Sequence, residues 1–347
     1  MTIALPRPDL AADAPILVTG AGGFIGGHLV AGLRALGFRR IRAVDIKPLD
    51  EWFQRFDDVE NRVADLRDLE ACRVACRGIA WVFNLAADMG GMGFIETHKA
   101  ECMISVLINT HLLMAAREAG VRRFFFASSA CVYNAAKQDR PDVTALKEED
   151  AYPAMPEDGY GWEKLFSERM CRHFSEDYGL ETRVARYHNV YGPHGTWQGG
   201  REKAPAAICR KVAEARLTGN RTIEIWGDGK QTRSFMYVDD CIWGTLALMN
   251  SDWREPINIG SAELVSIDRL VDLVEEIAGV RLERRYDLAA PKGVRGRNSD
   301  NTLIRRVLGW EPATRLRDGL RVTYRWVADQ LMRDLTKRAR YSTATSA

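Results

Sequence analysis

A short apolar run, a group of glycines and an amphipathic stretch follow one another near the start of the chain. The apolar run covers residues 16–18, and apolar positions at helical spacing cover residues 24–36. A second apolar run, residues 41–44, ends at Asp45. Short apolar runs predict buried strands and the spaced positions predict a helix, so this part of the chain is expected to form a βαβ unit.

The same alternation of strand and helix patterns continues over the first half of the chain. Further buried strands are predicted at 62–64, 81–85, 123–127 and 182–186, and helices near 68–76, 98–118 and 158–178. Strands that alternate with helices run parallel, because each helix carries the chain back across the sheet. The expected fold class is therefore α/β, with a Rossmann-type, doubly wound parallel sheet.

The pattern changes after residues 191–193. Glycine-rich loops follow, with a helix predicted at 205–215, short strands around 223–226, and helices near 267–278 and 317–333. We therefore predict a dinucleotide-binding domain over residues 15–190 and a smaller α/β C-terminal lobe for the substrate over residues 191–335. If the apolar run at 256–260 pairs with the main sheet, the two lobes interleave rather than split at one boundary.

The two ends of the chain are expected to be loose. Residues 1–14 are rich in Pro, Ala and Asp, and residues 336–347 are basic and then rich in Ser, Thr and Ala. Such segments bury little apolar surface. We expect a flexible tail at the first and a frayed tail at the second.

Composition and charge exclude several classes of protein. With 347 residues and 46% hydrophobic content, the chain can bury an α/β core and a smaller lobe. Its 49 basic and 47 acidic residues give a net charge of +2, which provides no general attraction for nucleic acid or a membrane surface. No apolar window is long enough to span a membrane, and seven scattered cysteines fit reduced thiols. A cytoplasmic protein without a metal site is expected.

The first glycine group has the spacing of a nucleotide-binding loop. Gly20, Gly23 and Gly26 lie between the first predicted strand and the helix that Phe24 and Ile25 begin. Glycines at these places permit a tight turn, close approach of a pyrophosphate to the helix N-terminus, and close packing of helix on strand. The spacing alone often marks only a turn, but its place between strand and helix favours dinucleotide binding.

Two aspartates follow the next two predicted strands. Asp45 lies nineteen residues after Gly26, where a carboxylate accepts hydrogen bonds from ribose hydroxyls and repels a 2′-phosphate. We therefore expect NAD rather than NADP, although a turn or cap residue would have the same appearance. Asp65 is a candidate neighbour of the adenine, and a helix cap explains it almost as well.

Tyr160 and Lys164 are four residues apart in a predicted helix, so their side chains share one face. A nearby ammonium and the positive nicotinamide would lower the pKa of the tyrosine from about 10 towards neutrality. A phenolate can then accept the proton of an alcohol during hydride transfer. Such a pair is common and usually structural, but its position behind the glycine loop favours this chemistry.

With these motifs in place, the chain from residue 16 to about 326 resembles the extended short-chain dehydrogenase/reductase family of NAD-dependent epimerases and dehydratases. A narrower resemblance, to the epimerases that act on carbons 3 and 5 of GDP-mannose, rests on four long strings, residues 84–95, 128–133, 191–205 and 294–300. The chain departs from that pattern at Asn134, where proline is expected, and in its longer N-terminal tail.

The resemblance implies a reaction that begins with oxidation. NAD takes hydride from carbon 4 of the sugar, the resulting ketone acidifies the hydrogens on carbons 3 and 5, and the hydride is later returned. NAD is therefore regenerated in each turnover and is expected to be held tightly. The implied products are GDP-L-galactose and, after inversion of carbon 5 alone, GDP-L-gulose.

The resemblance also assigns catalytic groups. Cys131 is the implied carbon base, Lys203 the acid on the opposite face, and Ser129 holds the carbon-4 hydroxyl beside Tyr160. Without the resemblance, a small buried residue, a solvated loop lysine and a backbone cap are the default interpretations. Related 4,6-dehydratases carry a glutamate base at the position of Cys131 and an acid at that of Ala130, so this chain lacks the acid that expels water.

Further positions are implied to bind the GDP-sugar. Arg297 is the first choice and Lys211 the second for the diphosphate, because guanidinium and ammonium groups suit phosphate charges. Outside the family pattern, such residues would be surface charges. Guanine is implied by the resemblance alone. The remaining implied substrate contacts are Gly93, Asn189, Glu202 and Gln231.

Two alternatives remain open. A 4-epimerase or 4,6-dehydratase for another nucleotide-sugar would share most motifs, although Ala130 argues against dehydration and Lys203 is superfluous for 4-epimerisation. A catalytically silent dinucleotide sensor would need no complete set of Ser129, Tyr160 and Lys164. We expect a homodimer through the helices near 98–118 and 158–178, whose apolar positions core packing explains equally well.

Overall fold

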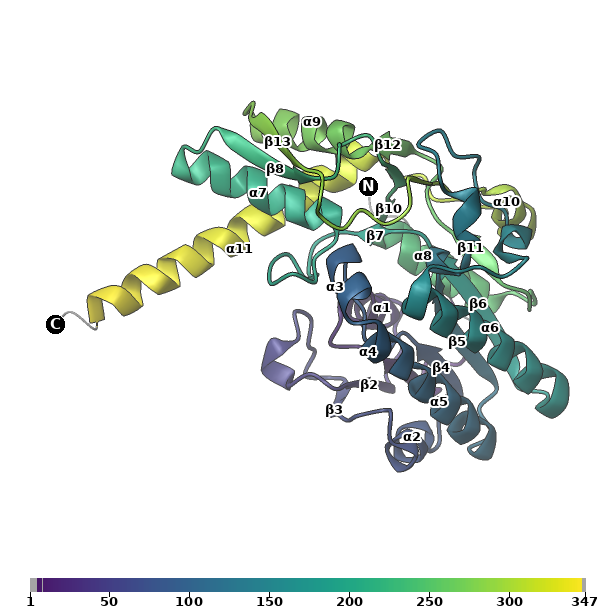
Figure 1. Cartoon of the computed structure of the whole chain (residues 1–347). Coiled ribbons are helices and arrows are strands. Elements are labelled where there is room, and N and C mark those ends of the chain that lie inside the picture. The colour runs from purple at the N-terminus through teal and green to yellow at the C-terminus, as the bar shows by residue number, and fades with distance from the viewer. Residues whose placement is uncertain (1–4, 8, 345–347) are drawn as a thin grey trace.

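A seven-stranded parallel sheet lies at the centre of the larger domain in this computed structural model, which describes residues 5–7 and 9–344 (Figure 1). Its strands follow the order β11-β6-β5-β4-β1-β2-β3, and all neighbours run parallel. The strands are β1 (Ile16–Thr19), β2 (Ile41–Asp45), β3 (Glu60–Val63), β4 (Trp81–Asn84), β5 (Arg123–Ser129), β6 (Glu181–Tyr187) and β11 (Ile257–Ile259). The order 3-2-1-4-5-6 is that of dinucleotide-binding sheets and confirms the predicted fold class.

Helices cover both faces of this sheet, which explains why its central strands are continuous apolar runs. Ile16 and Val18 of β1 pack in one core cluster with α1 (Phe24–Ala35) and α8 (Val238–Asn250). The intervening Leu17 points to the other face and packs in a second cluster. The helices of that second face are α2 (Leu69–Cys76), α5 (Val106–Glu118) and α6 (Asp158–Tyr178).

The smaller lobe contains three short sheets, β7–β10, β12–β9–β14 and β8–β13, and the packed helices α7, α9 and α11 (Figure 1). Its strands are β7 (Val190–Tyr191), β8 (Thr222–Trp226), β9 (Thr232–Ser234), β10 (Met236–Tyr237), β12 (Leu264–Ser266), β13 (Glu283–Asp287) and β14 (Gly296–Arg297). Its helices are α7 (Ala204–Thr218), α9 (Ile267–Ala278) and α11 (Leu316–Ala344), whereas α10 (Thr302–Leu308) packs against β11 of the main sheet.

The two lobes interleave along the chain. β11 pairs with β6 in the main sheet, and α8 packs on α1, although both elements lie within the range predicted for the substrate lobe. The chain therefore leaves the larger domain after β6, returns with α8 and β11, and leaves again. The apolar run at 256–260 is the returning strand.

The predicted helix near 98–118 is divided in the structure. It consists of α4 (Lys99–Ile104) and α5, separated at Ser105, and α3 (Met92–Thr97) precedes it. The Oγ of Ser105 accepts a hydrogen bond from the backbone N–H of Asp88 at 2.9 Å. Ser105, at the break between the two helices, thus holds the loop after β4 in place. The periodicity of apolar residues does not reveal this break.

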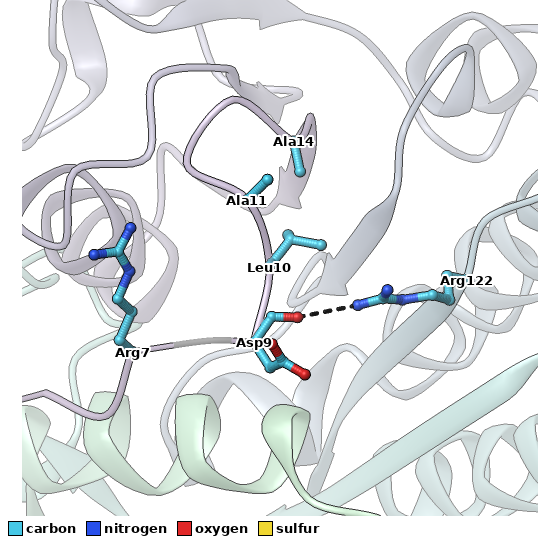
Figure 2. Close-up of a pocket in the computed structure, with 6 residues that line it drawn as sticks. All are labelled: Arg7, Asp9, Leu10, Ala11, Ala14 and Arg122. Atoms are coloured by element: carbon cyan, nitrogen blue, oxygen red, sulfur yellow. Dashed lines mark hydrogen bonds between the residues drawn. The ribbon is translucent and has the colours of Figure 1, made fainter.

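The N-terminal segment lies against the larger domain over its described residues. The Asp9 N–H donates to Asn250 Oδ1 at 2.6 Å, and Arg122 donates to the Asp9 carbonyl at 3.2 Å (Figure 2). A surface pocket of about 780 Å³ beside these contacts is lined by Arg7, Asp9, Leu10, Ala11, Ala14 and Arg122. In place of the expected flexible tail, residues 9–14 are thus held; residues 1–4 and 8 lie outside the described residues.

The C-terminal helix is longer than predicted. α11 continues through residue 336, where fraying was expected, to Ala344, and Figure 1 shows its last turns extending away from the body of the molecule. The final three residues of the expected frayed tail lie outside the described part of the chain. No helix among the described residues is long and apolar enough to cross a membrane.

Candidate active site

The glycine loop between β1 and α1 leaves no space for side chains. Gly20 has a φ of +68°, and a Cβ on Gly26 would lie 2.1 Å from the Gly20 carbonyl oxygen. Gly23 caps α1 without a side-chain hydrogen bond, so the first N–H groups of the helix, starting at Phe24 and Ile25, have no side-chain acceptor there. This loop has the geometry that a pyrophosphate requires at a helix N-terminus.

Asp45 lies at the end of β2, directly beside this loop. It is 8% exposed, and its carboxylate accepts hydrogen bonds from the N–H groups of Gly22 and Lys47, both at 3.0 Å. Asp65 has turned instead towards Arg67, whose guanidinium lowers the pKa of that carboxyl through a hydrogen bond. The loop and Asp45 thus fit the phosphate and ribose of NAD, whereas Asp65 is occupied by a neighbouring arginine.

Tyr160, Lys164 and Ser129 come together where α6 passes the end of β5. Tyr160 and Lys164 are 5% and 3% exposed, and the Lys164 Nζ lies 5.6 Å from the centroid of the Tyr160 ring. Ser129 hydrogen-bonds the Tyr160 side chain, and its Oγ accepts the N–H of Cys131 at 3.2 Å. Three of the predicted catalytic groups are therefore neighbours.

The protein alone does not lower the pKa of Tyr160. Burial raises this pKa well above 10, and the charges of Cys131 and Glu163 act in the same direction. Lys164 is 3.5 Å from the carboxylate of Glu163, which offsets the ammonium. The protein's own groups therefore do not produce the lowering of the Tyr160 pKa that the sequence predicted, and a positive nicotinamide would have to provide it.

Cys131 lies in a single 3₁₀ turn at the end of β5, pressed against α6. A Cβ on Gly161 would lie 2.4 Å from the Cys131 carbonyl oxygen, so only glycine permits this approach. The thiol packs with Phe94, Cys102 and Tyr160. It is 7% exposed, whereas the other six cysteines are fully buried.

Lys203 lies at the N-terminus of α7 and is close enough to Cys131 for their charges to interact. Burial lowers the pKa of Lys203 below 10.5, while a negative charge on Cys131 would raise it. A lysine with a lowered pKa gives up its proton more readily. The two predicted proton-transfer groups thus approach the same region from different lobes.

The loop after β4 connects these two lobes. The Gly91 N–H donates to the Arg201 carbonyl at 3.0 Å, and a Cβ on Gly91 would lie 2.5 Å from the Glu202 carbonyl oxygen. Gly93 faces Trp226 so closely that a Cβ would lie 3.3 Å from the indole. Small residues are therefore needed here for the lobes to approach each other.

The other predicted substrate-binding residues lie around the smaller lobe. Asn189 donates to the Ser234 carbonyl at 3.2 Å. Gln231 is 5% exposed; its Nε2 donates to the Trp226 carbonyl at 2.8 Å, and its buried Oε1 has no partner among the described residues. That oxygen is available to accept a hydrogen bond.

Glu202 and Lys211 already have protein partners. Glu202 accepts hydrogen bonds from the Gly200 N–H at 2.7 Å and from Arg210 at 3.1 Å. Lys211 donates to the Glu224 carbonyl at 2.9 Å. Both residues stay predicted substrate contacts, and each would have to change partners to reach a phosphate or a sugar.

Arg297 lies beside the thiol rather than free in solvent. It is 4% exposed, its Nη1 is 3.6 Å from Cys131 Sγ, and its Nε donates to Gln138 Oε1 at 2.7 Å. Its Nη2 forms an ion pair with Glu157. Each of the three guanidinium nitrogens thus has a protein partner. To bind the diphosphate as predicted, Arg297 would have to exchange at least one of these partners.

Sequence reasoning missed three residues of this region, Arg233, Gln138 and Glu157. Arg233 is 9% exposed, and burial lowers its pKa to about 10, with Cys131 acting in the opposite direction. Its guanidinium donates to the carbonyls of Thr232, Lys292 and Val294 at 2.6 to 3.1 Å. Proximity to Gln231 was the one available signal for Arg233; Gln138 and Glu157 come from loops without a motif.

Comparison with known proteins identifies the family of this chain. The model of the NAD dependent epimerase/dehydratase family matches residues 16–260. The chain belongs to this family. Among curated members it is 48% identical to GDP-mannose 3,5-epimerase 1 of Oryza sativa subsp. japonica and 47% identical to GDP-mannose 3,5-epimerase of Arabidopsis thaliana. Both matches span 323 residues, 93% of this chain and 84% of the relative.

Solved structures of related proteins confirm the epimerase fold. The UDP-glucose 4-epimerase of Thermotoga maritima, solved with UDP-glucose, superposes with a TM-score of 0.81 at 27% identity, over 91% of this chain and 99% of that one. MoeE5, solved with UDP-glucose and NAD, superposes with a TM-score of 0.76 at 31% identity, over 92% and 100%. Family members thus bind NAD and a nucleotide-sugar on this fold.

Proposed function

We propose that this epimerase converts GDP-D-mannose to GDP-L-galactose, and to GDP-L-gulose when carbon 5 alone is inverted. The observation that carries the proposal is 48% identity to a GDP-mannose 3,5-epimerase over 93% of the chain. The convergence of Cys131 and Lys203 from two lobes beside Tyr160 supports it, because inversion at a carbon needs one group to remove a proton and another to return it.

The first step is oxidation at carbon 4. As the phenolate, which a positive nicotinamide would favour, Tyr160 accepts the proton of the carbon-4 hydroxyl, and Ser129, which hydrogen-bonds Tyr160, holds the same oxygen. NAD, when bound, supplies the acceptor for the hydride and later its donor. Reversal of this step returns the proton from Tyr160 to the oxygen.

The second step exchanges protons at carbon. The Cys131 thiolate takes a proton from the carbon beside the ketone, and the electron pair is delocalised onto the ketone oxygen as an enolate. Lys203 gives its ammonium proton to the opposite face of that carbon, which inverts the centre. The lowered pKa of Lys203 favours this transfer. The same pair can act at carbons 3 and 5, since either carbanion is an enolate, once the thiol has lost its proton to solvent and the amine has regained one.

We propose NAD, retained through the cycle, as the cofactor rather than NADP. Gly20, Gly23 and Gly26 leave space for the pyrophosphate, and the carboxylate of Asp45 would accept the ribose hydroxyls and repel a 2′-phosphate. Phe24 and Ile25 contribute the helix N-terminus. The reaction has no net oxidation, so a retained cofactor needs no second substrate.

We propose Arg233 and Gln231 as contacts for the diphosphate and sugar. Arg233 is a buried cation whose hydrogen-bond acceptors among the described residues are backbone carbonyls, and a phosphate would offset the cost of burying its charge. The Gln231 Oε1 can accept a sugar or nucleobase donor. Gly93, Asn189 and Lys211 lie in or next to the smaller lobe and are proposed as further substrate contacts.

We also propose a homodimer in the cytoplasm. Other side chains of α4, α5 and α6 pack in the core, but five apolar side chains on these helices are 41% to 52% exposed: Met103, Ile104, Leu107, Trp162 and Phe166. A second copy would cover this apolar surface. All seven cysteines are free thiols, which fits a reducing compartment.

Incubation of the purified protein with GDP-mannose in deuterated water tests the function. Deuterium should appear at carbons 3 and 5 without added NAD, and Cys131→Ala should abolish incorporation while NAD remains bound. Cys72→Ala, on the distant helix α2, is the matched control and should retain activity. No incorporation from GDP-mannose, together with turnover of UDP-glucose, would favour the 4-epimerase alternative that the solved relatives suggest.

A further inference from the structure

Arg297 contacts the sulfur of Cys131, although its predicted role is to bind the diphosphate. The distance from its Nη1 to Cys131 Sγ is 3.6 Å, and both side chains are buried. A guanidinium that donates a hydrogen bond to sulfur stabilises a thiolate, and this effect is strong where water is excluded. The arginine therefore lies where a charge would favour the basic form of the thiol.

The position of Arg297 is fixed by two neighbours from the segment before and at the start of α6. Gln138 is fully buried, and its Oε1 accepts the Nε–H of Arg297 at 2.7 Å. The Gln138 carbonyl also accepts the N–H groups of Arg295 and Gly296 at 2.9 and 3.2 Å, which sets the register of β14. A Cβ on Gly296 would lie 2.2 Å from the Arg140 carbonyl oxygen, so the strand is pressed against this segment.

Glu157 completes the arrangement. Its carboxylate pairs with the Nη2 of Arg297, and its backbone N–H donates to the Cys131 carbonyl at 3.0 Å. One residue thus contacts both the arginine and the backbone of the cysteine. Because its negative charge opposes a thiolate, its contribution is to geometry rather than to charge.

We infer that Arg297 stabilises the Cys131 thiolate as a catalytic group, and that Gln138 and Glu157 are positioning residues that hold its guanidinium against the sulfur. The inference rests on the proposed function for the reaction that the thiolate serves. The contact between the guanidinium and the sulfur is present in the protein without substrate. The ionisable groups that lie around Cys131 on neighbouring elements are Arg297, Glu157, Tyr160, Lys203, Arg233 and Cys102.

Thiol alkylation separates this role from a structural one. The purified protein, without sugar, is treated with iodoacetamide across a pH series, and modification of the peptide that contains Cys131 is quantified by mass spectrometry. The six other cysteines are fully buried and should react slowly. Arg297→Gln should move the pH midpoint of Cys131 alkylation upward by about one unit or more, which lowers the rate at neutral pH about tenfold.

Gln138→Glu is a second variant that keeps the shape of the site. A carboxylate against the Arg297 Nε would offset the guanidinium, so the midpoint should again rise. A purely structural ion pair would instead raise the melting temperature and leave the midpoint unchanged, which would overturn the inference. Should Arg297→Gln fail to fold, this variant decides alone.

Arg295→Gln is the matched control, because it removes one positive charge next to the same strand from a side chain that pairs with Asp228. Its midpoint should equal that of the parent protein; an equal rise in Arg295→Gln would overturn the inference. An unchanged midpoint in Arg297→Gln together with deuterium incorporation from GDP-mannose would overturn the role of Arg297 alone. A raised midpoint without incorporation would contradict the proposed function and leave the thiolate arrangement standing.

Discussion

At the scale of single residues, Arg233 is a buried cation without a carboxylate partner among the described residues. Burial lowers its pKa to about 10, which is a sign that its charge is poorly compensated in the protein alone. An anionic ligand would restore the balance, so Arg233→Met should weaken binding of GDP by about tenfold or more. Isothermal titration calorimetry with GDP measures this change.

The neighbouring Lys230 provides the control for that measurement. Its side chain is exposed, so Lys230→Met should leave the affinity for GDP almost unchanged. Equal affinities for Arg233→Met and the parent protein would show that Arg233 has a structural role only.

His188 makes the stability of the fold depend on pH. It is fully buried, burial lowers its pKa to about 4, and its Nε2 lies 3.0 Å from Asn258 Oδ1. The unfolded chain binds the proton near pH 6.5, before the folded protein does, so stability is complete above that pH and falls as pH drops towards 4. At pH 5 the free energy of unfolding should be lower by about 2 kcal/mol on this account.

Denaturant unfolding at pH 7 and pH 5 measures this dependence. His188→Gln should remove its share, while the partly buried His28, whose pKa is also lowered to about 4, keeps its own. His173→Gln, on the exposed surface of α6, should retain the full dependence of the parent protein. An identical loss in His188→Gln and the parent would refute the assignment.

At the scale of elements, α6 reaches the active site because Gly161 lacks a side chain. A Cβ there would meet the Cys131 carbonyl oxygen at 2.4 Å, and backbone cannot yield as a side chain does. Gly161→Ala should therefore move Tyr160 away from Ser129, lower activity by about a hundredfold and destabilise the fold by about 1 to 3 kcal/mol. Activity assays and thermal unfolding measure these effects.

Arg172→Ala, on the exposed face of the same helix, is the control, since it should change neither property by much. Normal activity in Gly161→Ala would mean that the close approach of α6 to the end of β5 is not needed for catalysis.

The elements that sequence predicts best are those with a single strong period or a buried run. The predicted helices at 158–178 and 267–278 coincide with α6 and α9, because their apolar positions repeat over several turns. The division at Ser105 was not predictable, since apolar residues continue across it and its cause is a tertiary hydrogen bond to Asp88. The position of the N-terminal segment likewise depends on distant partners such as Asn250.

The candidate site divides in the same way. Gly20, Tyr160 and Lys164 carry spacing that chemistry imposes locally, so sequence identifies them without coordinates. Gln138 and Glu157 have no local signature, because their importance comes from contact with Arg297, which is more than a hundred residues away. Resemblance supplied Cys131 and Lys203, which the glycine loop and the Tyr/Lys pair alone would not have identified.

At the scale of the whole molecule, the apolar surface of α4, α5 and α6 predicts the oligomeric state. Trp162 and Phe166 are four residues apart on one helical face and are 43% and 52% exposed. Phe166→Asp should convert a dimer into a monomer, because a charge buried at such a contact lacks a partner. Light scattering after size-exclusion chromatography measures the molar mass.

Leu288→Asp is the control, since it places the same charge on another exposed apolar residue, 63% exposed in the smaller lobe. It should leave the molar mass unchanged. A monomeric parent protein would contradict the dimer proposal directly.

The interleaving of the two lobes also bears on how new specificities can arise on this frame. α8 and β11 return the chain to the larger domain before the polypeptide leaves it again. The smaller lobe therefore consists of two excursions. The first begins after β6 and ends at α8, and the second begins after β11. Loops within either excursion can lengthen, shorten or be exchanged while Tyr160, Ser129 and the glycine loop keep their places. Under the proposed placement of the sugar contacts in the smaller lobe, transplanting one excursion between relatives is expected to alter the sugar that is accepted and to leave the hydride chemistry intact.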